Sequence, residues 1–446
     1  SFTTDVDTEL IALVTENTTF NQQYLSLENR YQFALTDLST DTVTLTVPLD
    51  TGIKLYSYAY FGDDFTLSEL ENTATQAEEF GETSSFTISS GDTSKEVSLK
   101  YFYRQMGGSI QGTELSLSTV VTTLAGDNDT NNVSTDETGV DASFSQIYTG
   151  ITTDGTNLYV AEYGSNKIRK IVIDNGTVTT LAGTGTSVST DGTGTAASFA
   201  RPMGITTDGT NLYVVEYTGH KVRKIVISTG VVTTLAGSGN ITVSGVSSDG
   251  TGTAASFNYP WGITTDGTNL YVTDRGNNKI RKIVIDNGTV TTLAGTGTSV
   301  STDGTGTAAS FAGPMGITTD GTNLYIVDYN GHKIRKLVIS TGVVTTLAGS
   351  SNGFADHDNG TLAKFYNPRG ITTDGTNLYV GDTSNRRIRQ IVIDNGTVTT
   401  LAGSGSSSST NGKGTAASFS SPEGITNDGN NLYVVDRTRS LIRKIE

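Results

Sequence analysis

The stretch TVVTTLAG at Thr119–Gly126 decides how the rest of the chain is organised, because its last six letters, VTTLAG, return throughout the sequence. Each later copy ends a segment that begins with GIT, continues with NLY and an acidic residue, and then has a basic run such as KIRKIVI. The later copies begin at Val178, Val232, Val290, Val344 and Val398. No such segment precedes the copy at Thr119, so the sequence has a spare strand at this point.

The other end of the array lacks a strand. The last GIT segment begins at Gly424 and stops at Glu446, where another VTTLAG strand is due. A closed ring, in which residues 119–126 complete the C-terminal unit, removes the exposed strand edges that an open array would leave. The sequence therefore predicts that Val120–Leu124 pairs with Leu441–Ile445.

The repeats have the period of β-propeller blades. They start at glycines spaced 54 or 58 residues apart, which are Gly150, Gly204, Gly262, Gly316, Gly370 and Gly424. Each repeat contains four strand-like pieces, and its Asp-Gly or Asn-Gly turns supply the positive φ angles of tight hairpins. A period of this length with four strands is typical of a propeller. We predict an all-β chain with a six-bladed propeller over residues 119–446.

Three phrases of the blade carry a family resemblance. GITTDG, NLYVVD and NKIRK resemble the hallmark of the NHL-repeat β-propellers, which is a GI-x-x-D strand, an L-Y-V-x-D segment and a following N-x-x-I. The resemblance covers residues 119–446 and implies the fold. The family includes protein-binding modules, RNA-binding modules and a few lyases or hydrolases, so the resemblance assigns no function.

The residues before the repeats form a separate region. Alternating apolar residues at Thr42–Leu49 and Glu96–Arg104 predict antiparallel strands with one buried face. We expect an N-terminal segment at residues 1–20, an acidic β-sandwich-like domain at residues 21–105 and a linker at residues 106–118. Up to Ser118 the chain has 18 acidic and 5 basic residues, against 27 and 24 in the remainder.

Composition narrows the classes of partner. A net charge of −16 argues against nucleic acid and anionic membranes, and no apolar run is long enough to span a bilayer. The chain has no cysteine, so disulfides and thiolate metal sites are unavailable. Only 17% of residues are charged, and Thr, Ser, Gly and Asn are abundant. This composition favours an extracellular or cell-surface protein.

A carboxylate and an arginine recur seven residues apart in every blade. Because an active site is needed once, groups repeated in every blade are interpreted as structural ion pairs. The pairs are Glu162 and Arg169, Glu216 and Arg223, Asp274 and Arg281, Asp328 and Arg335, Asp382 and Arg389, and Asp436 and Arg443.

Two patterns suggest metal sites, and both have simpler interpretations. The turn aspartates offer oxygen ligands for calcium, but they also suit Asx turns and lack the order of a calcium loop. They are Asp154, Asp208, Asp266, Asp320, Asp374 and Asp428. His220, His332 and His357 are candidate zinc ligands, yet the first two alternate with Asn166 and Asn278, as duplication of a blade pair predicts. We therefore expect no required cofactor, with calcium as the alternative.

The innermost strands contribute no obvious chemistry. Their threonines are predicted to line a polar, inert channel, and they are Thr152, Thr206, Thr264, Thr318, Thr372 and Thr426. The sequence contains no nucleophile elbow, phosphate loop or HExxH helix.

The leading hypothesis is an exported, non-catalytic structural or interaction protein, such as a surface, matrix or filament building block. Its candidate assembly residues are Leu10, Ile11, Leu13 and Val14, which could add a strand to a neighbouring subunit head to tail or belong to their own domain. The alternatives are a propeller that binds a ligand or glycan and, third, a propeller lyase or hydrolase. Unique polar residues at the channel mouth would favour a ligand, whereas unique residues on the outer strands would favour assembly.

Overall fold

The computed structural model divides the chain into two compact units, Ser1–Arg104 and Gln105–Glu446. In the first unit the structure describes six strands, and in the second it describes residue 115 and residues 117–127, 133–239 and 247–446. The strands of the first unit are β1 (Phe2–Thr3), β2 (Asn29–Leu35), β3 (Thr42–Leu45), β4 (Lys54–Phe61), β5 (Ser84–Thr87) and β6 (Glu96–Arg104). They form an antiparallel sheet in the order β1-β2-β6-β4 and a two-stranded sheet of β3 and β5.

Of the predicted N-terminal segment at residues 1–20, the structure describes only Phe2 and Thr3. Phe2 pairs with Leu35 and Thr3 with Ala34, so β1 joins a strand of its own unit. The candidate assembly residues, Leu10 to Val14, lie outside the described residues. Assembly through them stays a prediction, as does the packing of the two sheets into a sandwich.

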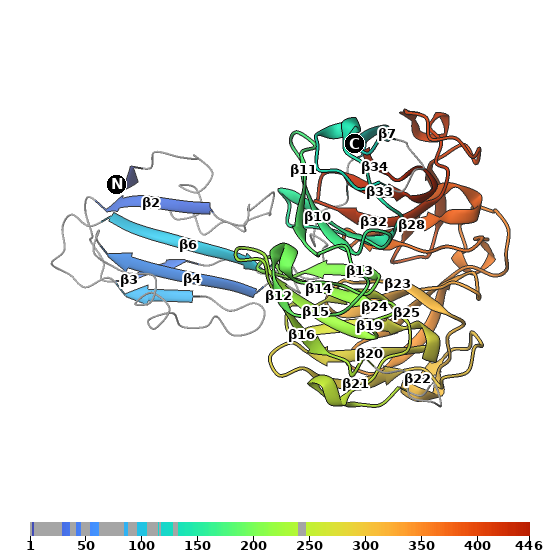
Figure 1. The fold of residues 1–446 in the computed structure, drawn as a ribbon, viewed down its shortest axis with the longest axis horizontal. Helices are drawn as coiled ribbons and strands as arrows, with labels where there is room; N and C mark the ends of the chain where they lie inside the picture. Colours follow the sequence, from blue (N-terminus) through green and yellow to red (C-terminus); the bar gives the residue numbers. More distant parts are fainter. Residues whose placement is uncertain are drawn as a thin grey trace. The chain divides into compact units, whose positions relative to one another are not determined.

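The second unit is an all-β propeller of six blades (Figure 1). From the channel outward, the first blade consists of β8 (Ile147–Thr153), β9 (Asn157–Glu162), β10 (Lys167–Val172) and β11 (Val178–Ala182). The second blade is β13 (Pro202–Thr207), β14 (Asn211–Glu216), β15 (Lys221–Val226) and β16 (Val231–Ala236). The third blade is β18 (Pro260–Thr265), β19 (Asn269–Asp274), β20 (Lys279–Val284) and β21 (Thr289–Ala294). The fourth blade is β23 (Pro314–Thr319), β24 (Asn323–Asp328), β25 (Lys333–Val338) and β26 (Val343–Ala348). The fifth blade is β27 (Ile371–Thr373), β28 (Asn377–Asp382), β29 (Arg387–Val392) and β30 (Val398–Ala402), and the sixth is β32 (Pro422–Asn427), β33 (Leu432–Asp436), β34 (Leu441–Ile445) and β7 (Val120–Ala125).

Short elements complete the blades. Two-residue outer strands extend four of the sheets, and they are β12 (Gly192–Thr193), β17 (Gly250–Thr251), β22 (Gly304–Thr305) and β31 (Gly412–Lys413). Single 3-10 turns are η1 (Gly139–Asp141), η2 (Gly194–Ala196), η3 (Gly252–Ala254), η4 (Arg275–Asn277), η5 (Gly306–Ala308), η6 (Gly360–Leu362), η7 (Thr383–Asn385), η8 (Gly414–Ala416) and η9 (Arg437–Arg439). Among the described residues, no helix has the length and apolar character needed to cross a membrane.

The core lies between blades rather than within one. Tyr159 and Ile168 of the first blade pack in one cluster with Leu212 and Val214 of the second, around Phe199 from the connection between them. The second strand of each blade is buried on both faces because neighbouring sheets cover it, which explains its nearly continuous apolar sequence. Each blade therefore depends on its neighbours for burial.

The ends of the ring meet in the sixth blade. β7 pairs antiparallel with β34, with Thr123 opposite Arg443 and Val121 opposite Ile445. The innermost strands β8 and β32 are also in contact. Figure 1 shows the C-terminus beside β7, although more than 300 residues separate them in the chain.

The channel is lined by isoleucines and glycines. Its walls include Ile151, Ile205 and Ile263 with their counterparts in the other blades, whereas threonines such as Thr152 are buried away from it. The prediction of a threonine-lined channel is therefore wrong. Successive side chains of a strand point in opposite directions, so the register that brings isoleucine to the channel turns the next threonine away.

Glycine at the start of the innermost strand keeps this channel narrow. A Cβ atom on Gly370 would lie 1.9 Å from the carbonyl oxygen of Glu423 in the next blade, and one on Gly150 would lie 2.0 Å from that of Met203. No real side chain tolerates such distances, so only glycine permits this approach of neighbouring strands.

Candidate functional site

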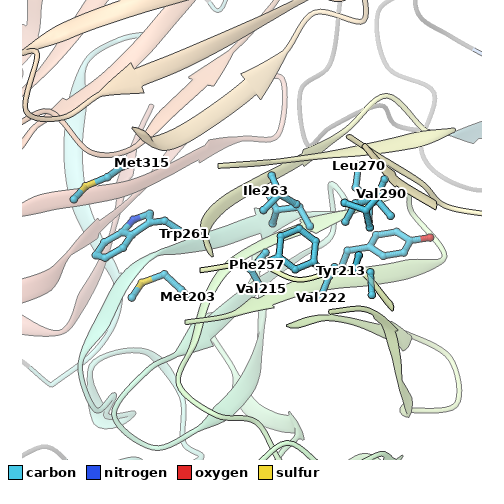
Figure 2. Packing of buried hydrophobic residues seen from close by; sticks show 14 residues of the cluster. Met203, Tyr213, Val215, Val222, Phe257, Trp261, Ile263, Leu270, Val290 and Met315 are labelled. Carbon is cyan, nitrogen blue, oxygen red and sulfur yellow. The ribbon is translucent and has the colours of Figure 1, made fainter. Parts of the chain in front are cut away.

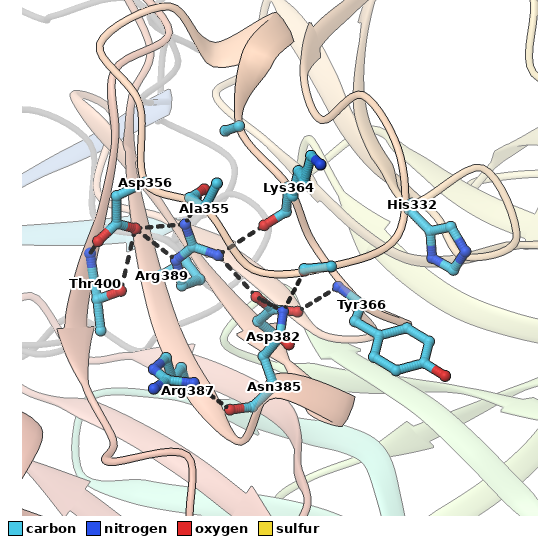
Figure 3. Close-up of polar contacts among 12 residues, drawn as sticks. His332, Ala355, Asp356, Lys364, Tyr366, Asp382, Asn385, Arg387, Arg389 and Thr400 are labelled. Atoms are coloured by element: carbon cyan, nitrogen blue, oxygen red, sulfur yellow. Dashed lines mark hydrogen bonds and ion pairs between the residues drawn. The ribbon is translucent and has the colours of Figure 1, made fainter.

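The repeated carboxylate and arginine pairs lie together in all six blades. In the fifth blade Arg389 donates from Nη1 to Asp382 at 2.8 Å and from Nη2 to Asp356 of the preceding loop (Figure 3). The same guanidinium donates to the carbonyls of Lys364 and Ala355, and neither Arg389 nor Asp382 is exposed to solvent. This arginine thus ties its own hairpin to the loop that enters the blade.

The other blades repeat this network with small changes. The distances within the pairs named above run from 2.6 Å to 3.6 Å. The loop carboxylates are Asp136, Asp191, Asp249, Asp303 and Asp356, and Asn411 takes their place in the sixth blade. Four of the arginines leave Nε without a partner among the described residues, but the terminal nitrogens of all six are engaged.

The pKa values of these carboxylates are shifted in two directions, because burial dominates in some of them and hydrogen bonds and charge dominate in others. Desolvation raises the pKa of Asp274 and Asp328, although an arginine opposes it in each case. For the loop residue Asp249, the hydrogen bonds from Thr292 and the charge of Arg281 outweigh burial and lower the pKa. The carboxylates and the terminal guanidinium nitrogens hold loops and strands together in the same way in each blade, so we interpret the networks as structural.

The turn aspartates are occupied by their own turns. Asp154 accepts hydrogen bonds from the backbone amides of Thr156 and Asn157 and from the Tyr159 hydroxyl, the last at 2.8 Å. The same contacts recur at Asp208, Asp266, Asp320, Asp374 and Asp428. Within the part of the chain that the structure describes, no three His, Asp or Glu side chains gather as a metal site. The expectation of no required metal, with calcium at these turns as the alternative, stays a prediction.

The candidate zinc ligands are placed as backbone acceptors. Nδ1 of His220 accepts from the amide of Tyr259 at 3.1 Å, and Nδ1 of His332 accepts from that of Asn367 at 3.3 Å. Oδ1 of Asn166 accepts an equivalent bond from Arg201. All three residues have positive φ angles, and burial lowers the pKa of both histidines, which favours the neutral acceptor form. The two histidines therefore replace asparagine in a local contact.

The symmetry of the ring breaks at one end of the channel. The residue before each channel glycine varies around the ring, as does the residue that follows each buried carboxylate, although some blades share a residue at these positions. The first set is Thr149, Met203, Trp261, Met315, Arg369 and Glu423, and the second is Tyr163, Tyr217, Arg275, Tyr329, Thr383 and Arg437. Strands β13 and β14 pair Pro202 with Glu216, so both sets lie at the end opposite the Asp-Gly turns. We call these residues, together with Tyr148, the mouth cluster.

An ionic half of the mouth cluster joins three blades. The fully buried carboxylate of Glu423 accepts from Arg369 at 3.0 Å and from Arg437 at 3.2 Å. Arg437 also donates to the Tyr148 hydroxyl at 2.9 Å and lies over the ring of that tyrosine. Burial raises the pKa of Glu423, while the two guanidinium groups oppose this shift.

An aromatic half surrounds Trp261. The indole meets Tyr148 and Tyr217 edge to face, with ring centroids 6.1 Å and 5.6 Å apart. Figure 2 shows Met203 and Met315 on either side of it. The guanidinium of Arg275 lies 5.1 Å from the centre of the indole ring, and that of Arg369 lies 6.0 Å from it.

Four side-chain atoms of the mouth cluster are buried without a partner among the described residues, and they are Oγ1 of Thr149, Nε1 of Trp261, and Nε of Arg275 and of Arg369. Trp261 is only 6% exposed, yet its buried Nε1 donates no hydrogen bond. Arg275 makes no ion pair or hydrogen bond through its guanidinium, and its Nε is buried. A buried donor without an acceptor costs about 1–3 kcal/mol, so such groups are expected where a ligand or water completes them.

Sequence reasoning missed the mouth cluster although its signal was present. The features that the repeats share are the ion pairs and the turn aspartates, whereas the mouth cluster lies where the repeats vary. Aligning them for differences would have singled out Trp261, Arg369 and Glu423, because one repeated position carries all three residue types.

Comparison with known proteins gives relatives for the propeller. A family model described as NHL repeat matches residues 257–283, the stretch that contains Trp261 and Arg275. NHL repeat-containing protein 2 of Gallus gallus is 27% identical over 330 residues, which cover 66% of this chain and 45% of that protein. The chain spans less than half the length of the curated relatives it matches.

Solved structures share the fold over most of the chain. A structural genomics protein of unknown function from Bacteroides thetaiotaomicron has a TM-score of 0.57 at 18% identity, and the match covers 94% of each chain. An auxiliary nutrient binding protein from the same organism has a TM-score of 0.55 at 15% identity, again over 94% of each chain. Identities this low show a common fold alone. The six sheets make residues 119–446 a six-bladed β-propeller, in which residues 257–283 match the NHL repeat and whose sequence is similar to NHL repeat-containing proteins.

Proposed function

We propose that this protein is a non-catalytic binding propeller that holds a small ligand at the mouth cluster. The observation that carries the proposal is the unpartnered Nε1 of Trp261, at a repeated position that carries Thr, Met, Trp, Arg or Glu in different blades. Ligand sites commonly combine an apolar, aromatic lining with a few polar groups that fix orientation. The mouth cluster has this composition, whereas the opposite end repeats one Asp-Gly turn six times.

The chemistry of the mouth cluster favours binding over catalysis. Its one carboxylate, Glu423, is held between Arg369 and Arg437. General acid and base chemistry needs a proton donor or acceptor with access to substrate, and Glu423 is fully buried. The names of the relatives, a repeat-containing protein and a nutrient binding protein, agree with a binding role.

Closure of the ring supports this role. The contact between Arg437 and Tyr148 joins the sixth blade to the first, across the seam that β7 and β34 close. We infer that the strand pairing keeps these two residues in register and so preserves the mouth cluster. A site that spans several blades requires a ring that does not open.

Two further proposals concern the setting of the protein. The low share of charged residues and the Thr, Ser and Gly content support a location outside the cell or on its surface. Self-association through residues 1–20 is the second proposal, and strand addition by a short apolar run supports it. Either would place the binding face of the propeller on a surface or matrix.

The chain contains a single tryptophan, so its fluorescence reports on the mouth cluster directly. We expect at least one member of a panel of oligosaccharides, small acids and short peptides to change this emission saturably. The Trp261→Ala variant should then lose binding in calorimetry, whereas Lys413→Gln, on an exposed outer strand, should keep it. Saturable binding that survives Trp261→Ala, or no binding from the whole panel, would contradict the proposal.

A further inference from the structure

The charges of the mouth cluster point to an anionic ligand. Three guanidinium groups, those of Arg275, Arg369 and Arg437, contact the same aromatic set, and Glu423 is the only carboxylate bonded to them among the described residues. Arg201 adds a fourth by lying over the ring of Tyr163. This local excess of positive charge stands out in a chain with a net charge of −16.

Only part of this positive charge is neutralised. Arg369 and Arg437 share Glu423, but Arg275 has no carboxylate within ion-pair distance in the described part of the chain. A half-buried arginine without a counterion is costly unless a bound anion supplies one. A water molecule could complete a hydrogen bond here, but it could not balance the charge.

Two of the unpartnered donors of the mouth cluster occur side by side. Trp261 and Arg275 belong to the same blade, and the guanidinium lies 5.1 Å from the indole ring centre. A carboxylate has several lone pairs and can accept from an arginine and an indole N–H together. A phosphate or sulfate would pair with arginine equally well. The surface beside Arg275 therefore has to distinguish ligands by the group that carries the anion.

That surface is a wall of aromatic rings. Tyr148, Tyr163 and Tyr217 are partly buried, and their ring centroids lie 4.8–6.4 Å apart along the wall. Partly exposed tyrosines present an apolar ring and a polar hydroxyl, which suits a flat ring that carries some polar groups. A long flexible acid would use these rings poorly.

Resting on the proposed function, we infer that the mouth cluster binds a small ligand whose carboxylate is attached to a six-membered ring. The carboxylate lies at the guanidinium of Arg275, beside Trp261, and the ring packs on the tyrosine wall. Two sources of this chemistry are acidic sugars and aromatic acids. Both classes present a carboxylate on a ring and would be recognised by the same contacts, so the choice of probes has to distinguish acidic sugars from aromatic acids.

The test titrates the full chain with four probes while following tryptophan fluorescence and heat. The probes are a galacturonate trisaccharide, its neutral galactose counterpart, benzoate and cyclohexanol. We expect at least one ring carboxylate to bind with a dissociation constant below about 1 mM. Its neutral counterpart should bind at least tenfold more weakly, and the arm that binds identifies the source.

Variants separate ligand recognition from stability. Arg275→Gln should weaken binding of the carboxylate probe at least tenfold without shifting the melting temperature, because the side chain has no ion pair to lose. Lys413→Gln removes one positive charge from the outermost strand of the sixth blade and should change nothing. Arg369→Gln is unsuitable because it would leave Glu423 partly unpaired.

Three results would overturn the inference. Equal binding of neutral and acidic probes would leave a ligand site at the mouth but remove the selection for carboxylate. Unchanged affinity in Arg275→Gln would remove the assigned contact. Binding only of ligands without a carboxylate in the wider panel would preserve the proposed function and reject this ligand class.

Discussion

Arg281 and Arg275 lie six residues apart in the same blade and have opposite environments. Arg281 is fully buried, pairs with Asp274 and Asp249, lies over the ring of Phe257, and recurs in every blade. Arg275 lies over the ring of Trp261 at a similar distance, has no ion pair among the described residues, and has a tyrosine, threonine or arginine at the equivalent place in other blades.

The comparison separates structural from recognition chemistry. Each blade must anchor the loop that enters it, so a group serving this need recurs at every blade, and both terminal nitrogens of its guanidinium are engaged, as in Arg281. A ligand needs one set of contacts, so its groups occur once and remain incomplete until it binds. Repetition therefore says more about the role of a charged residue here than its type or burial does.

The largest effect is expected from Arg281→Met. It leaves Asp274 buried without its counterion, which typically costs about 3–5 kcal/mol of the free energy of unfolding. Arg275→Gln is the matched control and should cost less than about 1 kcal/mol. Denaturant unfolding of both variants measures the difference, and similar costs would show that the two arginines do not differ in role.

The ring closure gives the next largest effect. Val121 of β7 and Val232 of β16 occupy the same place in their blades, and both are buried. Replacing either with alanine should cost about 2 kcal/mol, from the lost methyl burial and the cavity left behind. Thermal and denaturant unfolding should give the same loss of stability for the two variants. A harmless Val121→Ala beside a costly Val232→Ala would mean that β7 does not close the ring in solution.

A smaller effect with a defined pH dependence is expected from Asp249→Asn, which copies the natural Asn411 of the sixth blade. The carboxylate is half exposed, so its loss should cost only about 0.5–1 kcal/mol at neutral pH. Its folded-state pKa is held below the ordinary 3.8, so its contribution is present above pH 3.8 and is lost as the pH falls through the folded-state value. Unfolding curves of both proteins should therefore converge in acid, and a constant gap would refute the assignment.

The smallest effect is expected from calcium removal. The turn aspartates already accept from two backbone amides and a tyrosine hydroxyl, as at Asp154, so a cation would have to displace these bonds. Dialysis against a chelator should shift the melting temperature by less than about 1 °C, because a ligand that does not bind the folded state adds no stability. A larger, calcium-restored shift would establish a metal site at this end of the ring.

The sequence by itself determined the number of blades, their strands and their internal pairs. The 54-residue period sets the blade count, and the spacing of seven between Asp274 and Arg281 brings the two together because they lie on consecutive antiparallel strands. Such local relations follow from strand geometry, which one repeat already contains. The family resemblance of the repeats is confirmed by the NHL match.

Only the tertiary structure decided what the channel and its mouth contain. The sequence alternation alone did not say whether Ile263 or Thr264 faces the axis, since that depends on how six strands are oriented around it. Tyr148, Trp261 and Arg369 come from blades more than 100 residues apart in the chain, and the repeat position that Trp261 and Arg369 share does not predict that their side chains meet. They meet because the ring closes, and the spacing of residues along the sequence does not predict contacts between different blades.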